Sequence, residues 1–288
     1  MNLIVKSDLE SLGGARRLVA VTPESAGWKF VSFAVYRMQA GSGIADATGN
    51  DEAAIIVLTG KCDVSVDDQL FRGCGTRDQL FAKIPAWTVY APRAARWTVR
   101  AVTDTLIAIA KSPVAGAKRT PKVVKPDDVA VELRGDGSTA RTVHHLLDID
   151  RTDVAERLLI VEVFTEPGAW SSFPPHKHDT DDPGKESYLE EAYYHRVLPE
   201  RGFVLQRVYD KAGLDETLTV HDGDTVLVPR GYHPVSVTPG TQSYYLNVMA
   251  GPDRSWNYQV DPDFVHLLSP GGSITGRTVT RHETGSEH

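Results

Sequence analysis

Hydrophobic positions along the chain are grouped in short segments that are rich in Val, Ile, Tyr and Thr. Gly, Pro, Asp or Asn separate these segments, as in WKFVSFAVYRMQAGSG, AAIIVLTGKCDVSV, RLLIVEVFTEPG and QSYYLNVMAGP. Enrichment in β-branched and aromatic residues between turn residues is typical of β-strands. Apolar residues at helical spacing of three and four are almost absent. The pattern therefore predicts an all-β protein.

The stretch from Lys111 to Arg141 has a different character. It contains prolines at 113, 121 and 126 and five basic residues before Asp127. Because proline has no backbone N–H to donate, a central strand cannot run through this stretch. We expect a Pro/Lys-rich linker over 113–138 between an N-terminal unit, 1–112, and a C-terminal unit, 139–272, with a flexible tail over 273–288.

The two halves share a faint repeat at an offset of 137 residues. Four residues of WTVYAPRAARW fall on identical residues of DTVLVPRGYHP, namely Thr88 on Thr225, Val89 on Val226, Pro92 on Pro229 and Arg93 on Arg230. Such self-similarity favours duplication of one β domain, so we expect two tandem β-barrels or sandwiches. The same offset puts Arg96 where the second half has His233. This indicates one active half and one structural half.

The composition narrows the functional classes. The 288 residues include 31 Lys and Arg against 38 Asp and Glu, a net charge of −7, which disfavours non-specific binding to nucleic acid. Cys62 and Cys74 are too few for a disulfide framework. We find no signal-peptide core and no apolar stretch of membrane-spanning length. A cytoplasmic protein with no nucleic-acid or membrane partner is expected.

Candidate metal ligands gather in the second half. His176 and His178 lie in FPPHKHDT, and residues two apart in an extended chain point to the same side. In SYLEEAYYHRV the alternation puts Glu191 and His195 on one strand face and Glu190 on the other. His233 in GYHPV offers a third imidazole. Three imidazoles and a carboxylate suit Zn, Mn, Fe or Ni.

The order of these residues resembles the two motifs of the cupin superfamily, which carry HxH, then a Glu on the next strand, and later GxxxxxPxGxxH. The matching residues are His176, His178, Glu191, Gly223, Pro229, Gly231 and His233, with one residue fewer between the last two. The resemblance implies that Glu191 is the carboxylate ligand, with Glu190 as the alternative. The chain departs from the pattern in its twelve-residue spacer DTDDPGKESYLE, which a loop can accommodate at small entropic cost.

The strings FPPHKHDTDDPGKESYLEEAYYHRV, GFVLQRVYD and GYHPVSVTPGTQSYYLNVMAGP together resemble the bacterial 5-deoxy-glucuronate isomerases of myo-inositol catabolism. The similarity covers most of residues 137–256. It implies a bicupin, that is, two tandem cupin-type β-barrels of the jelly-roll kind. It also implies a metal-dependent aldose–ketose isomerase that converts 5-deoxy-D-glucuronate to 5-dehydro-2-deoxy-D-gluconate. One divalent ion per chain is expected on His176, His178, Glu191 and His233, with Zn first and Mn or Fe as alternatives.

Such an isomerisation needs a general base that reaches a carbon-bound proton. The candidates are His195, which shares the strand face of Glu191, and then Glu190. The competing interpretation is that His195 only orients a neighbouring group and that Glu190 is an ordinary strand residue.

The substrate is a sugar acid, so a guanidinium should bind its carboxylate in bidentate fashion. Arg207 and Arg254 are the substrate-binding candidates, and Arg196 borders His195; any of them could be a surface residue instead. Asn247 could hydrogen-bond a sugar hydroxyl if its strand face lines the barrel.

Three alternative functions stay open at this point. Another uronate ketol-isomerase or a cupin dioxygenase would use the same ligand set. A non-catalytic sugar-binding bicupin would hold the ion only for structure or not at all. A homo-oligomer is compatible with all of them.

Overall fold

The structure is a computed structural model that describes residues 2–7, 10–12 and 14–268. The predicted tail, 273–288, lies outside the described residues. Strands dominate, and the single α-helix among the described residues is α1 (Pro23–Ala26), which has only four residues. The short 3-10 helices are η1 (Leu80–Ala82), η2 (Pro126–Asp128), η3 (Gly137–Thr139) and η4 (Pro262–Leu267). The prediction of an all-β protein is confirmed. None of the described helices is long and apolar enough to span a bilayer.

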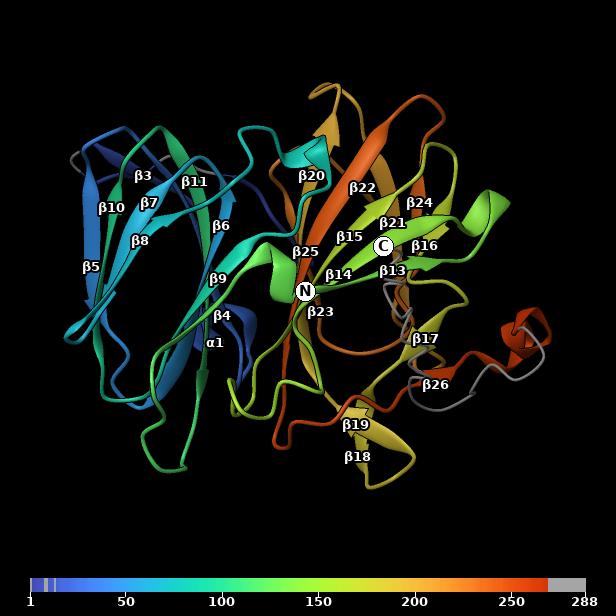
Figure 1. Cartoon of the computed structure of the whole chain (residues 1–288). Helices are drawn as coiled ribbons and strands as arrows, with labels where there is room; N and C mark the ends of the chain where they lie inside the picture. Colours follow the sequence, from blue (N-terminus) through green and yellow to red (C-terminus); the bar gives the residue numbers. More distant parts are fainter. Residues whose placement is uncertain (1, 8–9, 13, 269–288) are drawn as a thin grey trace, which may run out of the picture.

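The first half of the chain forms two antiparallel sheets, drawn in blue to green in Figure 1. The larger sheet has the order β12 (Lys122–Val124), β9 (Trp87–Ala91), β6 (Asp51–Thr59), β11 (Thr105–Pro113), β4 (Ser32–Met38), β3 (Ala15–Val21), β2 (Glu10–Leu12). The smaller sheet has the order β5 (Gly43–Ala47), β10 (Arg96–Ala101), β7 (Cys62–Val66), β8 (Gln69–Cys74). Buried side chains from both sheets, such as Ile55 and Trp97, pack in one core between them.

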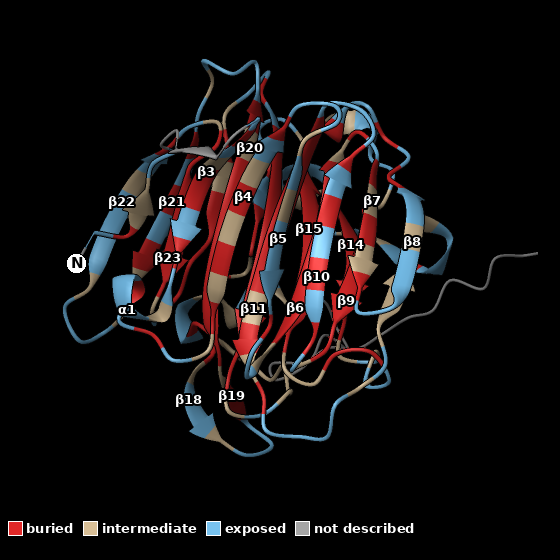
Figure 2. Cartoon of the chain, turned by 90° about the vertical axis from the view of Figure 1, so that its left-hand side faces the viewer, coloured by how far each residue is buried: buried red, intermediate tan, exposed pale blue. Residues whose placement is uncertain are grey.

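Residue patterns explain which strands lie inside. β6 contains the continuous apolar run AAIIVL, and every one of these residues is buried because the strand is covered on both faces. β10 alternates exposed and buried residues, as Figure 2 shows, because one of its faces meets water. The hydrophobic pattern thus separates the inner sheet from the outer sheet.

The second half repeats this plan with one large and one small antiparallel sheet. The large sheet has the order β1 (Ile4–Val5), β23 (Thr225–Val228), β20 (Glu190–Leu198), β25 (Gln242–Ala250), β15 (Leu159–Thr165), β14 (Arg141–Leu147), β13 (Ala130–Arg134). The small sheet has the order β16 (Trp170–Ser171), β24 (Val235–Val237), β21 (Val204–Tyr209), β22 (Asp215–Val220). That each pair of sheets closes into a cupin-type barrel stays a prediction.

The two halves are joined more closely than a simple linker implies. β1, at the N-terminus, pairs with β23 of the second half, with Ile4 opposite Val226. The segment 113–138 also contains structure, since β12 is an edge strand of the first large sheet and β13 an edge strand of the second. Pro121 and Pro126 lie on either side of β12, an edge strand, where a sheet tolerates proline, and Pro113 is the last residue of β11. No central strand runs through the whole segment, although the central strand β11 ends inside it at Pro113. The linker and the domain boundaries stay predictions.

The outer faces of the two large sheets share one apolar core. It contains Phe33 and Ile56 from the first half together with Tyr194 and Tyr244 from the second. The rings of Phe33 and Tyr194 have centroids 6.0 Å apart. The contact between the halves therefore contains a continuous hydrophobic layer.

Two small two-stranded sheets lie beside the site, and the second of them is a hairpin. β17 (His176–Lys177) pairs with β26 (Gln259–Val260), and β18 (Asp179–Asp182) pairs with β19 (Glu186–Tyr188). The hairpin occupies the spacer between His178 and Glu191. The insertion thus folds on itself and leaves β20 in the large sheet, as loop entropy allows.

Candidate metal centre

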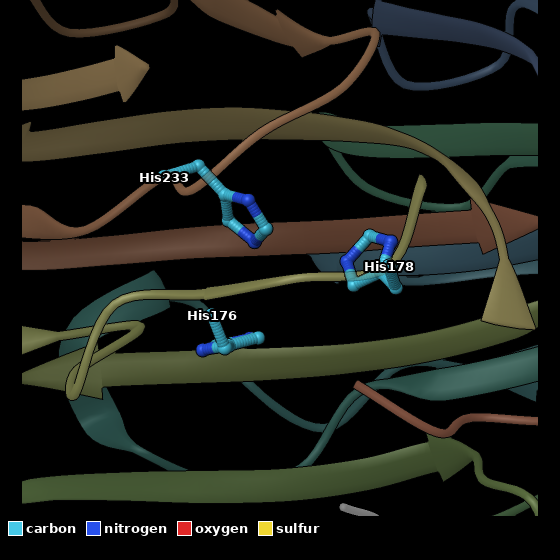
Figure 3. Close-up of side chains that lie close together, drawn as sticks. All are labelled: His176, His178 and His233. Carbon is cyan, nitrogen blue, oxygen red and sulfur yellow. The ribbon is translucent and has the colours of Figure 1, made fainter. Parts of the chain in front are cut away.

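Three histidines of the second half lie close together (Figure 3). His176 and His178 follow the extended FPP segment, and His233 lies in the turn between β23 and β24. Lys177 points away from them, and its Nζ is 2.6 Å from an oxygen of Asp179 and 2.8 Å from one of Glu186. The alternation predicted for HKH is therefore present, with both imidazoles on one side.

Each of these histidines uses Nδ1 to hold a backbone carbonyl. The Nδ1 atoms lie 3.1 Å from the oxygen of Pro174, 3.3 Å from that of Leu189 and 2.9 Å from that of Gly231, for His176, His178 and His233 respectively. A carbonyl can only accept, so Nδ1 carries the proton in each ring. The Nε2 lone pair is left available, which is the form that binds a metal ion.

The free atoms converge on one point. One ligand atom from each histidine lies within 4.8 Å of the others. Oε2 of Glu191 is 3.0 Å from Nε2 of His178 and 3.1 Å from Nε2 of His233, yet all three of these buried atoms lack a hydrogen-bond partner. Buried polar atoms that approach one another without bonding are costly unless something satisfies them together. A divalent cation fits this donor set.

Electrostatics keeps Glu191, His176 and His233 in their ligand forms. Burial alone would raise the pKa of Glu191, but the charges of His233 and His178 outweigh it and hold that pKa at about 2. Burial, with the neighbouring imidazoles, lowers the pKa of His176 to about 3 and also lowers that of His233. Burial opposes protonation of His178 as well, but Glu191 raises its pKa. An ionised carboxylate beside these imidazoles is suited to a cation, which would replace the proton that Glu191 favours on His178.

Asn247 contacts the carboxylate directly. Its Nδ2 donates to Oε1 of Glu191, the oxygen that does not face the histidines. The two residues reach each other across neighbouring strands β20 and β25. Asn247 also lines the cavity of the second half. Its contact with Glu191 is observed, whereas a contact with a sugar hydroxyl stays a prediction.

The cluster lies at the wall of a cavity of about 910 Å³ inside the second half. His176 and Glu191 line it, together with Val143, Val161 and Val163. Its aromatic lining consists of Trp170, Phe173, Tyr193, Tyr245, Trp256 and Tyr258. A cavity of this size accommodates a small metabolite, and its mixture of apolar and charged or polar side chains suits a polar one.

His195 lies on the Glu191 face of β20, as the alternation predicts, but it is fully buried and does not line the cavity. Its ring stacks on Tyr193 at 6.1 Å, and its Nε2 is 2.9 Å from Oε1 of Gln206. Burial lowers the pKa of His195 to about 4. The structure therefore places it behind Tyr193, which fits an orienting side chain and not a base that touches substrate.

Glu190 faces the other way, into the contact between the halves. Its carboxylate accepts the backbone N–H groups of Lys29, Phe30 and Val31 at 2.7, 2.7 and 3.0 Å. Burial raises the pKa of Glu190 and these three donors lower it. The structure does not bring Glu190 to the histidines, so the hypothesis that it is a base or a ligand is not supported by its position.

The arginines proposed for substrate binding also lie elsewhere. Arg207 is on the exposed face of β21, and its Nε and Nη2 donate to Asp215 at 2.7 and 2.8 Å. Arg254 donates to backbone carbonyls, among them that of Ile149 at 2.8 Å. Arg196 is paired with Asp222 at 2.7 Å. None of the three lines the cavity, and each is held by a partner elsewhere in the protein.

Sequence reasoning missed two arginines that do line it, Arg134 and Arg141. They end β13 and begin β14, at the border of the segment interpreted as a linker. The alternation in AVELR was the available signal, but the neighbouring Pro, Lys and Gly residues obscured it.

The first half offers no comparable centre in the part of the chain that the structure describes, where the three histidines are the one cluster with metal-ligand spacing. Arg96, at the start of β10, is exposed. This agrees with the asymmetry predicted from the repeat, although the number of bound ions stays a prediction.

Comparison with known proteins adds independent evidence. The profile of the KduI/IolB family matches residues 3–267. A protein of Geobacillus kaustophilus named 5-deoxy-glucuronate isomerase is 46% identical over 247 residues, which cover 85% of this chain and 88% of the relative.

Solved structures also resemble this chain. An IolB-like protein from Salmonella typhimurium superposes with a TM-score of 0.87 at 40% identity, over 93% of this chain and 99% of that one. An oxalate decarboxylase from Lactobacillus farciminis superposes with a TM-score of 0.66 at 11% identity, over 94% of this chain and 91% of its own, which shows a shared fold alone.

Proposed function

This chain belongs to the KduI/IolB family, and on that basis we propose that it is a metal-dependent aldose–ketose isomerase acting on 5-deoxy-D-glucuronate. The product would be 5-dehydro-2-deoxy-D-gluconate, as in the breakdown of myo-inositol. The name carried by relatives at more than 40% identity supports the substrate, and the histidine cluster supports the metal.

One observation carries the proposal. Nε2 of His178, Nε2 of His233 and Oε2 of Glu191 approach within 3.0 and 3.1 Å at a cavity wall without bonding to one another. His176, Glu191 and Asn247 connect this point to the cavity. A purely structural cluster would instead pair its buried polar atoms.

The donor set accounts for the type of ion. Three neutral imidazoles and one carboxylate suit Zn²⁺ first, with Mn²⁺ or Fe²⁺ as alternatives, and the backbone carbonyls that hold each Nδ1 fix the rings before the ion binds. Once bound, such an ion acts as a Lewis acid that stabilises negative charge on the carbonyl and hydroxyl oxygens of the substrate.

The protein supplies the remaining requirements. An aldose–ketose shift moves hydrogen between adjacent carbons and leaves the composition of the substrate unchanged, so it needs a shielded site more than a second reactant. The buried aromatic side chains of Tyr193 and Tyr245 limit water around the cluster. Burial, with the charge of Glu191, raises the pKa of Tyr193 well above its usual value, so its hydroxyl, 3.3 Å from Oγ of Ser172, stays protonated.

The test is incubation of the purified protein with 5-deoxy-D-glucuronate under anaerobic conditions, followed by NMR. We expect the ketone product to appear, to disappear after treatment with a chelator, and to return with added Zn²⁺, Mn²⁺ or Fe²⁺. Turnover that requires oxygen would instead indicate a dioxygenase. Absence of product from protein with a full complement of metal would reject the proposed substrate.

A further inference from the structure

Two guanidinium groups lie side by side on the wall of the cavity that contains the metal centre. Arg134 and Arg141 are directly opposite each other on the antiparallel strands β13 and β14. Both line the same cavity as His176 and Glu191. Like charges at such cross-strand positions repel, so the pair has a cost that calls for compensation.

Of the two, Arg134 alone has a carboxylate as a direct partner among the described residues, while the charge of that carboxylate, Glu132, acts on Arg141 from farther away. Nε and Nη2 of Arg134 donate to the two carboxylate oxygens of Glu132 at 2.9 and 2.6 Å, which is a bidentate pair. Arg141 donates instead to the carbonyl oxygens of Thr139 at 2.7 Å and Phe173 at 2.9 Å. Carbonyls orient a guanidinium without neutralising it. Among the residues that the structure describes, no carboxylate forms an ion pair with Arg141.

Arg141 nevertheless keeps its charge. Burial and the positive charge of Arg134 lower its pKa to about 10, which leaves the group protonated near neutral pH. The same two effects make an anion favourable beside it, because an anion would offset both the lost hydration and the repulsion. The terminal nitrogens of a guanidinium retain N–H groups for such a ligand after one bond each.

The backbone links this arginine to the metal centre. The carbonyl of Phe173 accepts from Arg141, and the carbonyl of the next residue, Pro174, is held by Nδ1 of His176. One short segment therefore fixes both groups relative to each other. A ligand with an anionic end and a carbonyl end could reach both within one cavity.

We propose that Arg141 binds the carboxylate of the sugar-acid substrate, with Arg134 held beside it by Glu132. This rests on the proposed function and deepens it, because it assigns the group that selects acids over neutral sugars. The carboxylate end lies at β13 and β14, and the opposite, aldehyde end lies at the histidines. Arg207 and Arg254, outside the cavity, take no part.

The experiment compares the wild type with Arg141→Gln and with Arg207→Gln, an exposed arginine outside the cavity. Calorimetry measures the binding of D-glucuronate and of its uncharged methyl ester to the metal-loaded proteins, while NMR measures KM and kcat with 5-deoxy-D-glucuronate. We expect Arg141→Gln to weaken binding of the acid and to raise KM about 10-fold to 100-fold. Its binding of the ester and its metal content should not change, and Arg207→Gln should match the wild type.

The two arms fail separately. A wild type that isomerises the substrate, together with an Arg141→Gln variant that keeps the preference for the acid, overturns the role of Arg141 and leaves the proposed function intact. If the wild type binds the acid without isomerising the substrate, and Arg141→Gln no longer binds the acid, the proposed function is overturned and the carboxylate site stands. If Arg141→Gln does not fold, Arg141→Met keeps the apolar stem and gives the same comparison.

Discussion

Glu190 and Glu191 are neighbours in β20, and their carboxylates act on opposite faces of the sheet. Glu191 points into the second-half cavity, 3.0 Å from Nε2 of His178. Glu190 points into the contact between the halves and accepts three backbone N–H groups of the first half. The pleat of one strand thus divides two chemically identical side chains between the site and the fold.

The contact made by Glu190 has a counterpart in the opposite direction. Glu52, in β6 of the first half, accepts the backbone N–H groups of Glu156, Arg157 and Leu158, each at 2.7 Å. Each half therefore sends one buried carboxylate to hold a loop of the other. This reciprocity agrees with the duplication inferred from the repeat in the sequence.

Glu191→Gln should lower metal affinity more than about tenfold while the protein stays folded. The amide removes the negative charge that stabilises the cation but keeps the volume of the side chain. The measurement is metal content per chain after dialysis against a weak chelator, together with the rate of isomerisation. Wild-type metal retention in this variant would contradict the assignment of Glu191 as a ligand.

Glu190→Gln should have the opposite profile, with metal content unchanged and the free energy of unfolding lowered by about 1–3 kcal/mol. The amide keeps one acceptor oxygen but replaces the other with an NH2 donor, which then faces backbone N–H groups that need an acceptor. Urea unfolding measures the loss, and Glu216→Gln, at an exposed position of β22, is the control. If Glu190→Gln lost its metal and kept the wild-type stability, Glu190 and not Glu191 would be the metal ligand.

The fold and part of the site could be predicted from the sequence because the signals are local. The alternation in SYLEEAYYHRV predicted that Glu191 and His195 share one face of the strand and that Glu190 lies on the other, and the structure has this arrangement. The three histidines could be predicted from HKH and GYHP for the same reason: in a strand or a turn, the direction of a side chain depends on only a few neighbouring residues.

The missed features depend on partners far along the chain. The three donors to Glu190 lie about 160 residues away, so nothing near it distinguishes a base from a structural acceptor. Arg141 looked like the end of a linker until β13 and β14 paired and placed it opposite Arg134. The strand pattern around Arg207 does not tell which face of the strand is buried, and only the packing of its sheet shows that Arg207 faces solvent.

The protein should bind one divalent ion per chain, because the described part of the first half has no cluster of three ligands. His233→Ala should reduce the content well below one, since it removes one of the three converging imidazoles. Elemental analysis of purified protein checks both values. His221→Ala, at an exposed position just before β23, is the matched control and should keep the wild-type content. Two ions in the wild type would refute the asymmetry between the halves.

The two halves should unfold in one transition and should not fold separately. The apolar layer that contains Phe33, Ile56 and Tyr244 would be exposed in either half alone, and β1 would lose its sheet. Circular dichroism and tryptophan fluorescence of the whole chain should give the same midpoint in urea. Fragments 1–112 and 139–272 should show no cooperative unfolding, and a sharp transition in either would contradict this.

Acid should weaken the contact between the halves through Glu162. This fully buried carboxylate faces Arg77 of the first half, the ring of His144 at 3.2 Å and the hydroxyl of Tyr244 at 2.9 Å. Burial would raise its pKa, but Arg77 and His144 outweigh burial and lower it to about 2 from a usual value of 4.5. A carboxyl with a depressed pKa in the folded state stabilises the protein above the unfolded pKa. Its contribution, about 3 kcal/mol, is lost as the pH falls from about 4.5 to about 2.

The difference in unfolding free energy between the wild type and Glu162→Gln should therefore shrink on acidification, by about 1 kcal/mol between pH 6 and pH 3.5. Urea unfolding at several pH values measures it, with Glu216→Gln as an exposed control whose effect should stay nearly constant. Because Glu162→Gln leaves Arg77 buried without its partner, the double variant Arg77→Met with Glu162→Gln provides a second comparison that removes both charges. A difference that does not change with pH in either comparison would mean that Glu162 titrates normally and that Arg77 does not hold it ionised.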